Sequence, residues 1–125
     1  MMAKILVVDD SALSRRVSRR ILEGAGHSVA DVPDGLAALE RYALDKPDLV
    51  LLDVTMTEMN GLEVLRQLRV MDPGAVVVMA TADVQTSTRE LADAGGASGF
   101  VPKPLAADAV LRAVAAALGR QGAAQ

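Results

Sequence analysis

The chain has 125 residues, of which 51% are hydrophobic and 23% are charged, so one globular domain with a packed core is expected. It contains no cysteine and a single histidine, which excludes disulfides, thiolate metal sites and any site that needs two imidazoles. The net charge of -3 excludes a basic surface for wrapping nucleic acid, and no apolar run approaches the roughly 20 residues that cross a bilayer. The first residues lead directly into a strand pattern without the layout of a signal peptide, so we expect a soluble, cytoplasmic protein with neither membrane nor nucleic-acid partners.

Five segments have the composition of β-strands, and three of them are continuous aliphatic runs, which is typical of strands buried on both faces of a sheet. They are Lys4 to Val8, Ser28 to Val32, Leu49 to Asp53, Ala75 to Ala80 and Gly99 to Val101.

Between and after these strands, apolar residues recur every three or four positions, which indicates amphipathic helices. The apolar rows are Leu13, Val17 and Ile21; Leu36, Leu39 and Ala43; Leu62, Leu65 and Leu68; and Val110, Leu111, Val114 and Leu118. A further helix is expected from Val84 to Ala94, where Val84 and Leu91 are the only large apolar anchors. Residues 119–125 lack apolar spacing, so we expect a domain over residues 1–119 and a short, disordered C-terminal tail over residues 120–125.

Five strands that alternate with five helices predict a doubly wound α/β domain with a parallel sheet. Sites in such sheets lie beyond the carboxyl ends of the strands. Asp9 and Asp10 follow the first strand, Asp53 ends the third, Thr81 follows the fourth, and Lys103 follows the fifth. With the strand order 2-1-3-4-5 of flavodoxin-like domains, which we adopt from that fold class, the first and third strands are neighbours and the three carboxylates meet.

Three ionised carboxylates that lie close together repel one another unless a cation is present. A ligand set of oxygens alone favours Mg²⁺, with Mn²⁺ as the alternative. A metal ion and a lysine on either side of a carboxylate suit phosphoryl transfer, because they align the phosphoryl group and neutralise its charge. Asp53 would then be the nucleophile and form an acyl phosphate.

At these residues the sequence resembles the receiver domain of two-component response regulators, from about Lys4 to Leu118. The resemblance rests on four motifs at strand ends, namely Val7-Val8-Asp9-Asp10, Leu51-Leu52-Asp53-Val54-Thr55-Met56 with Met59-Asn60-Gly61, Ala80-Thr81-Ala82, and Gly99-Phe100-Val101-Pro102-Lys103-Pro104.

The resemblance implies a phosphorylation-activated switch that accepts a phosphoryl group on Asp53 from a sensor histidine kinase or a histidine phosphotransfer protein. It implies that Asp10, Asp53 and the Thr55 carbonyl bind Mg²⁺, that Asp9 acts through water, and that Lys103 pairs with the phosphoryl group. The protein would catalyse its own phosphorylation and dephosphorylation without being an enzyme for another substrate.

The resemblance also implies a switch in which the Thr81 hydroxyl moves toward the phosphoryl group and Phe100 responds. Output would be contact with a downstream protein through the fourth helix, the fifth strand and the fifth helix. The segment from Ser11 to Arg20 is most similar to stand-alone, chemotaxis-type receivers. Three positions depart from the family pattern, since Thr57 replaces a frequent proline, Asn60 a frequent aspartate and Phe100 a frequent tyrosine.

Two other functions would need residues that this chain lacks. A phosphohydrolase of the haloacid dehalogenase type also forms an aspartyl phosphate at a strand end, but it needs a second acid two residues later, where this chain has Thr55. A flavin or nucleotide carrier would need a glycine-rich phosphate loop and stacking aromatics, and the sequence has neither.

The arginines of the first predicted helix, Arg15, Arg16, Arg19 and Arg20, form two rows spaced by four residues. They are interpreted as a solvated face, with docking to an acidic or kinase surface as the functional alternative.

Overall fold

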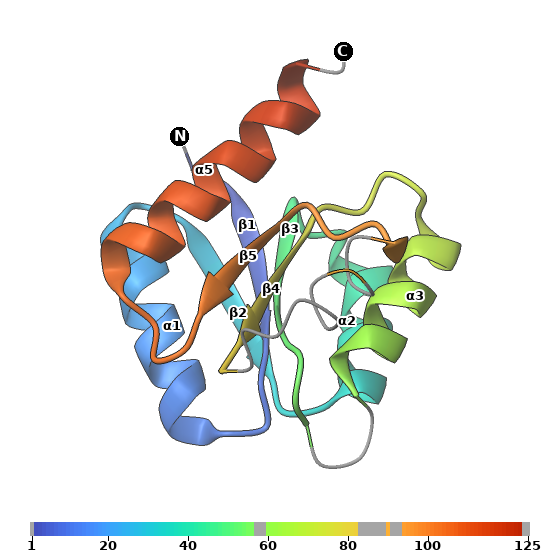
Figure 1. The fold of residues 1–125 in the computed structure, drawn as a ribbon, viewed down its shortest axis with the longest axis horizontal. Helices are drawn as coiled ribbons and strands as arrows, with labels where there is room; N and C mark the ends of the chain where they lie inside the picture. Colours follow the sequence, from blue (N-terminus) through green and yellow to red (C-terminus); the bar gives the residue numbers. More distant parts are fainter. Residues whose placement is uncertain (1, 57–59, 83–89, 91–93, 124–125) are drawn as a thin grey trace.

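The computed structural model describes residues 2–56, 60–82, 90 and 94–123, and its centre is a five-stranded parallel sheet. The strands are β1 (Lys4–Val8), β2 (Ser28–Val32), β3 (Leu49–Asp53), β4 (Val77–Thr81) and β5 (Gly99–Pro102). Their order is β2-β1-β3-β4-β5, which confirms the predicted topology (Figure 1). The reversal of winding direction lies between β1 and β3, where sheets of this kind place their sites.

Helices cover both faces of the sheet. They are α1 (Ala12–Gly24), α2 (Gly35–Asp45), α3 (Gly61–Met71) and α5 (Ala107–Ala123). Figure 1 shows α1 and α5 on one side of the sheet and α2 and α3 on the other. Four helices have bounds within the described residues, one fewer than predicted. Of the helix expected from Val84 to Ala94, residues 84–89 and 91–93 lie outside the described residues.

Short polar side chains start three of the helices directly after strands or their loops. The Ser11 Oγ accepts a hydrogen bond from the Ser14 N–H, and the Asp34 carboxylate accepts one from the Ala37 N–H. The Asn60 side-chain oxygen accepts from the first turn of α3 in the same way. Each cap pairs a backbone N–H that the first turn of the helix leaves unpaired, which favours the start of the helix at that residue.

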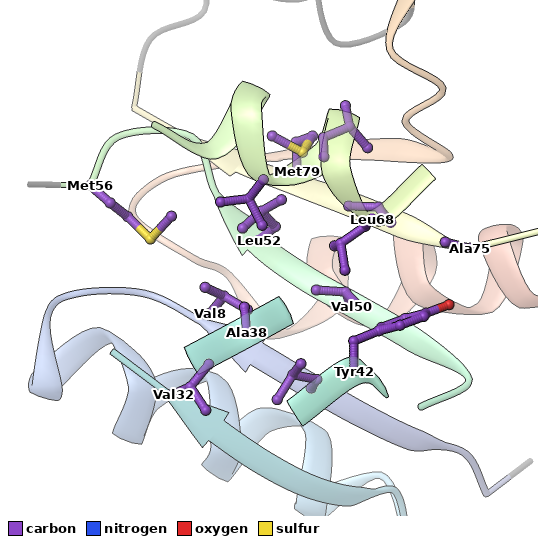
Figure 2. Close-up of a cluster of buried hydrophobic side chains, with 14 of the residues drawn as sticks. Val8, Val32, Ala38, Tyr42, Val50, Leu52, Met56, Leu68, Ala75 and Met79 are labelled. Carbon is purple, nitrogen blue, oxygen red and sulfur yellow. The ribbon is translucent and has the colours of Figure 1, made fainter. Parts of the chain in front are cut away.

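Two hydrophobic layers hold the helices onto the sheet. Leu52 and Met79 belong to the layer beneath α2 and α3, and Leu51 and Val78 belong to the layer beneath α1 and α5. Figure 2 shows the first layer, with Met56 at one end and Tyr42 at the other. All residues of β3 and β4 are buried, as the continuous aliphatic runs predicted.

The first two helices bury faces that coincide only in part with the apolar rows seen in the sequence, since Ile21 and Leu39 pack partly buried against the core. On α1, Leu13 is 67% exposed and Val17 39% exposed, whereas Ser18 and Leu22 are buried. On α2, Leu36 is exposed and the buried row is Gly35, Ala38 and Tyr42. A small residue such as serine or alanine lets a helix lie close to the sheet. The helix face that contacts the sheet is therefore not always the face with the largest apolar side chains.

Element boundaries differ slightly from prediction. β4 starts at Val77 and ends at Thr81, and β5 extends to Pro102. α5 continues to Ala123, past Leu118, the last apolar residue of its predicted row. The division into a domain over residues 1–119 and a tail over residues 120–125 stays a prediction. Among the described residues, no helix is long and apolar enough to cross a membrane.

A hydrogen bond between side chains joins α2 to the end of α3. The hydroxyl of the buried Tyr42 donates to Asp72 Oδ2 over 2.7 Å, and Asp72 Oδ1 accepts from the Gly74 N–H over 2.9 Å. Burial raises the pKa of the Tyr42 hydroxyl, and the hydrogen bond to Asp72 raises it further. The contact therefore requires a protonated tyrosine.

We predict that Tyr42→Phe lowers the free energy of unfolding by roughly 2 kcal/mol at neutral pH, because a hydrogen bond to a carboxylate is lost. Above about pH 10 the unfolded wild type loses the tyrosine proton while the folded state keeps it, so wild-type stability falls with rising pH. The variant lacks this loss, and the difference between the two proteins should shrink. Urea unfolding at pH 7 and pH 10.5 measures both effects, and equal stabilities at pH 7 would contradict the first.

Candidate functional site

The candidate site is built on the adjacent ends of β1 and β3. Val8 pairs with Leu52 in the parallel register, so Asp9, one residue on, lies alongside Asp53. Both carboxylates are buried, with Asp9 3% exposed and Asp53 5% exposed. Two buried acids at neighbouring strand ends follow directly from the strand order.

A lysine from the far end of the sheet reaches both acids. Lys103 Nζ lies 2.8 Å from Asp9 Oδ2 and 3.4 Å from Asp53 Oδ2, although β3 and β4 separate β5 from β1 in the sheet. The Lys103 N–H also donates to the Thr81 carbonyl over 2.8 Å, which extends the β4–β5 pairing past the strand end. The Lys103 ammonium is thus anchored by its own backbone and by two carboxylates.

A third carboxylate completes an acidic cluster. Asp9, Asp10 and Asp53 each offer one oxygen, and these oxygens lie within 4.8 Å of one another, with Asp10 on the exposed side. Three carboxylate oxygens without sulfur or imidazole suit a small hard cation such as Mg²⁺ or Mn²⁺, so the donor set fits the predicted metal. The Thr55 N–H donates to Asp53 Oδ1 over 3.4 Å, which brings the predicted fourth ligand residue next to the cluster.

The surroundings of Asp53 disfavour the ionised form of its carboxyl group. Burial raises the pKa of the Asp53 carboxyl, the negative charge of Asp9 raises it further, and Lys103 offsets only part of the rise. Burial by itself would lower the pKa of the Lys103 ammonium, but the hydrogen bond to Asp9 and the charge of Asp53 outweigh it and the pKa is raised. The lysine therefore stays charged, and the cluster has more negative than positive charge.

Gly61 fixes the distance between α3 and the backbone of the site. A Cβ at Gly61 would lie 2.2 Å from the Asp53 carbonyl oxygen and 2.7 Å from Val54 Cα. The Gly61 N–H donates to the Val54 carbonyl over 2.8 Å. Only glycine permits this approach. In the sequence Gly61 counted only as part of the Met59-Asn60-Gly61 motif, and its close contact with the site backbone was not predicted.

The remaining predicted residues lie at the same sheet edge or next to it. Thr81 is buried and directly follows Ala80, the register partner of Asp53. Phe100 pairs with Met79, so it lies further back along the sheet, half-buried against the hydrophobic layer under α2 and α3. The peptide bond between Lys103 and Pro104 is cis. Thr57 lies outside the described residues.

The comparison with protein families gives a match to the response regulator receiver domain over residues 5–115. The chain belongs to the response regulator receiver family. This receiver domain is 41% identical over 114 residues to the chemotaxis protein CheY of Listeria monocytogenes, covering 90% of this chain and 96% of that protein. It is 40% identical to the response regulator MprA of Mycobacterium bovis, covering 96% of this chain but 52% of that protein.

Among solved structures, this receiver domain resembles the Vibrio cholerae chemotaxis protein CheY4, with a TM-score of 0.88 and 29% identity over 92% of this chain and 98% of that one. Family membership makes the protein a phosphorylation-activated signalling switch of two-component systems, a phosphoacceptor that works with a kinase and downstream targets. These similarities give no support to the haloacid dehalogenase alternative.

We predict that Asp53→Asn stabilises the metal-free protein by roughly 1 kcal/mol at neutral pH, because it removes a buried anion beside Asp9. The raised pKa of Asp53 means that the folded wild type holds a proton that the unfolded chain releases above about pH 4. Wild-type stability is therefore lost as pH rises from that value through the folded pKa, and the variant should lose less.

Urea unfolding in EDTA between pH 4 and pH 8 tests this expectation. Added Mg²⁺ should stabilise the wild type more than the variant, since the ion binds the folded state. A variant that is less stable than the wild type in EDTA at pH 7 would show that the Lys103 pairing outweighs the repulsion.

Proposed function

We propose that Asp53 is the phosphoacceptor and that the protein catalyses its own phosphorylation and dephosphorylation. The observation that carries the proposal is the buried Asp53 carboxylate, which lies beside Asp9 and Asp10 and 3.4 Å from the Lys103 ammonium. A carboxylate nucleophile next to a cluster that can bind a cation, and within reach of a fixed ammonium, is suited to phosphoryl transfer.

In the proposed reaction an Asp53 oxygen attacks the phosphorus of a phosphohistidine on the donor protein. The new oxygen–phosphorus bond forms an acyl phosphate, while the phosphorus–nitrogen bond breaks and its electron pair stays on the imidazole. Lys103 shifts its pairing from the Asp53 carboxylate to a phosphoryl oxygen, and its ammonium stabilises the phosphoryl charge after only a small movement. In dephosphorylation, water attacks the phosphorus and returns Asp53 as a carboxylate with release of inorganic phosphate.

The metal proposed for this site is Mg²⁺, with Mn²⁺ as the alternative. Asp10, Asp53 and the Thr55 carbonyl would hold it directly, and Asp9 would hold it through water. When bound, the ion neutralises negative charge that builds up on the phosphoryl oxygens. The support is the all-oxygen donor set and its net negative charge, which is unfavourable without a cation.

We predict that acetyl phosphate and Mg²⁺ add one phosphoryl group per wild-type chain and none to Asp53→Asn, as measured by intact mass. Asp108→Asn is the matched control, because Asp108 on α5 is an exposed aspartate away from the site. A full adduct on Asp53→Asn would contradict the assignment of the phosphoacceptor. Release of many phosphates per chain without an adduct would instead support a hydrolase.

The proposed switch couples Thr81 to Phe100. Thr81 pairs with Pro102 and Met79 with Phe100, so the side chains of Thr81 and Phe100 belong to the same face of the sheet. A Thr81 hydroxyl that moves toward the phosphoryl group gains a charge-assisted hydrogen bond and vacates space on that face. Phe100 can then rotate inward, and phosphate shifts the population by its different affinity for the two arrangements.

We predict that Thr81→Ala still accepts phosphate but transmits little of the signal. Backbone amide shifts at Phe100 and Val101 should change on phosphorylation in the wild type and by less than half as much in the variant. Thr81→Ser keeps the hydroxyl and should respond like the wild type. Equal responses in the Ala and Ser variants would exclude the hydroxyl as the coupling group.

The proposed partners are a sensor histidine kinase or a histidine phosphotransfer protein as donor, and a downstream protein as target. The target surface would comprise β5, α5 and the segment from Val84 to Ala94, of which residues 84–89 and 91–93 lie outside the described residues. We propose a cytoplasmic protein with no membrane or nucleic-acid contact, on the strength of family membership and the net charge of -3.

A further inference from the structure

We propose that Arg15 is a positioning residue for the proposed phosphotransfer site, because its guanidinium bridges the backbone carbonyl of Asp9 and the carboxylate of Asp31. The inference deepens the proposed function, since the turn that Arg15 holds is the one that carries Asp9 and Asp10. The sequence pattern placed Arg15 on a solvated helix face. Its side chain is instead only 20% exposed.

The bridge joins three elements. Arg15 Nη1 donates to the Asp9 carbonyl over 2.8 Å, and Arg15 Nε lies 3.9 Å from Asp31 Oδ2 on β2. Arg19, one turn later on α1, lies 3.6 Å from the other Asp31 oxygen and also pairs with Glu23. Asp31 thus pairs with the guanidinium of Arg15, which also binds the Asp9 carbonyl.

Each polar group of Asp9 has a hydrogen-bond partner, and Arg15 is the partner of the carbonyl. Its N–H donates to the Val32 carbonyl, Oδ1 accepts from the Ser11 N–H over 2.9 Å, and Oδ2 accepts from Lys103 over 2.8 Å. The Asp9 carbonyl is the fourth group, and Arg15 satisfies it. Removing the guanidinium leaves a carbonyl of a buried residue without this partner and frees the peptide unit that leads into Asp10 to rotate.

The backbone of Arg15 closes the same turn. The Arg15 N–H donates to the Ser11 carbonyl over 3.0 Å, and the Ser11 Oγ caps α1. The main chain of Arg15 therefore forms a hydrogen bond of the first turn of α1, and its side chain binds the backbone just after β1. A lysine could keep the charge but not the planar, two-ended geometry.

A role in positioning and a role through charge predict opposite signs for metal affinity. A positive charge near three carboxylates weakens their attraction for Mg²⁺, so removing it would tighten binding if charge were all that mattered. If Arg15 positions the turn, removing it weakens binding, because outer-shell groups that orient ligands contribute roughly 10-fold or more to metal affinity.

The experiment compares Arg15→Gln, Arg15→Lys and the control Arg16→Gln, whose parent side chain is on the exposed face of α1. Mg²⁺ affinity without any phosphoryl donor is measured by calorimetric titration. The Ser11 amide is followed in metal-free protein by ¹H–¹⁵N spectra, and urea unfolding gives the stability of each variant.

We expect both Arg15 variants to bind Mg²⁺ roughly 10-fold more weakly and to shift the Ser11 amide, while Arg16→Gln stays near wild type on both measures. Phosphoryl uptake from acetyl phosphate should slow in the same two variants. Unchanged or tighter Mg²⁺ binding in Arg15→Gln would overturn the proposal, and so would wild-type affinity in Arg15→Lys.

Two further outcomes are distinguishable. If urea unfolding shows that Arg15→Gln is largely unfolded, Arg15→Lys carries the same test, since it keeps charge and helix propensity. If the wild type takes no phosphoryl group on Asp53, the proposed function fails, and the Mg²⁺ affinity together with the Ser11 amide still decides the role of Arg15.

Discussion

Lys103 holds two buried carboxylates of like charge at the ends of neighbouring strands, and most of the site depends on this contact. The strand order brings Asp9 and Asp53 together whether or not their charges favour it. One ammonium cannot neutralise the three carboxylates of the cluster, so the site has a surplus of negative charge in the metal-free state. That surplus costs stability and at the same time gives the site its affinity for a cation.

The site is fixed by backbone contacts on both sides of the sheet. On the α3 side, Gly61 lies directly against the Asp53 carbonyl, where no side chain fits. On the α1 side, Arg15 bonds to the Asp9 carbonyl. The β5 edge of the sheet is less enclosed, since Phe100 on this strand is only half-buried.

The helix faces were predicted less well than the strands. Strands β1 to β3 begin and end at the predicted residues, because aliphatic runs buried on both faces leave little ambiguity. On α1 the apolar row was Leu13, Val17 and Ile21, yet only Ile21 packs against the core, beside the buried Ser18 and Leu22. Periodicity indicates that a helix has an apolar side, but the buried side is chosen by how closely the helix approaches the sheet and which polar side chains find partners. The Asp31 carboxylate, absent from any sequence argument, pairs with Arg15 and Arg19, and of these two the Arg15 side chain is only 20% exposed while Arg19 stays 41% exposed.

The sequence by itself determined the fold class, the strand-end positions of Asp9, Asp10, Asp53, Thr81 and Lys103, and the family, because hydrophobic runs and polar residues at their ends are local signals. Only the tertiary structure decided that Lys103 spans from the last strand to the first, that Gly61 must be a glycine, and that Arg15 reaches back to Asp9. These contacts join residues whose proximity depends on packing distances and side-chain directions. Neither is encoded in the spacing of residue types along the chain.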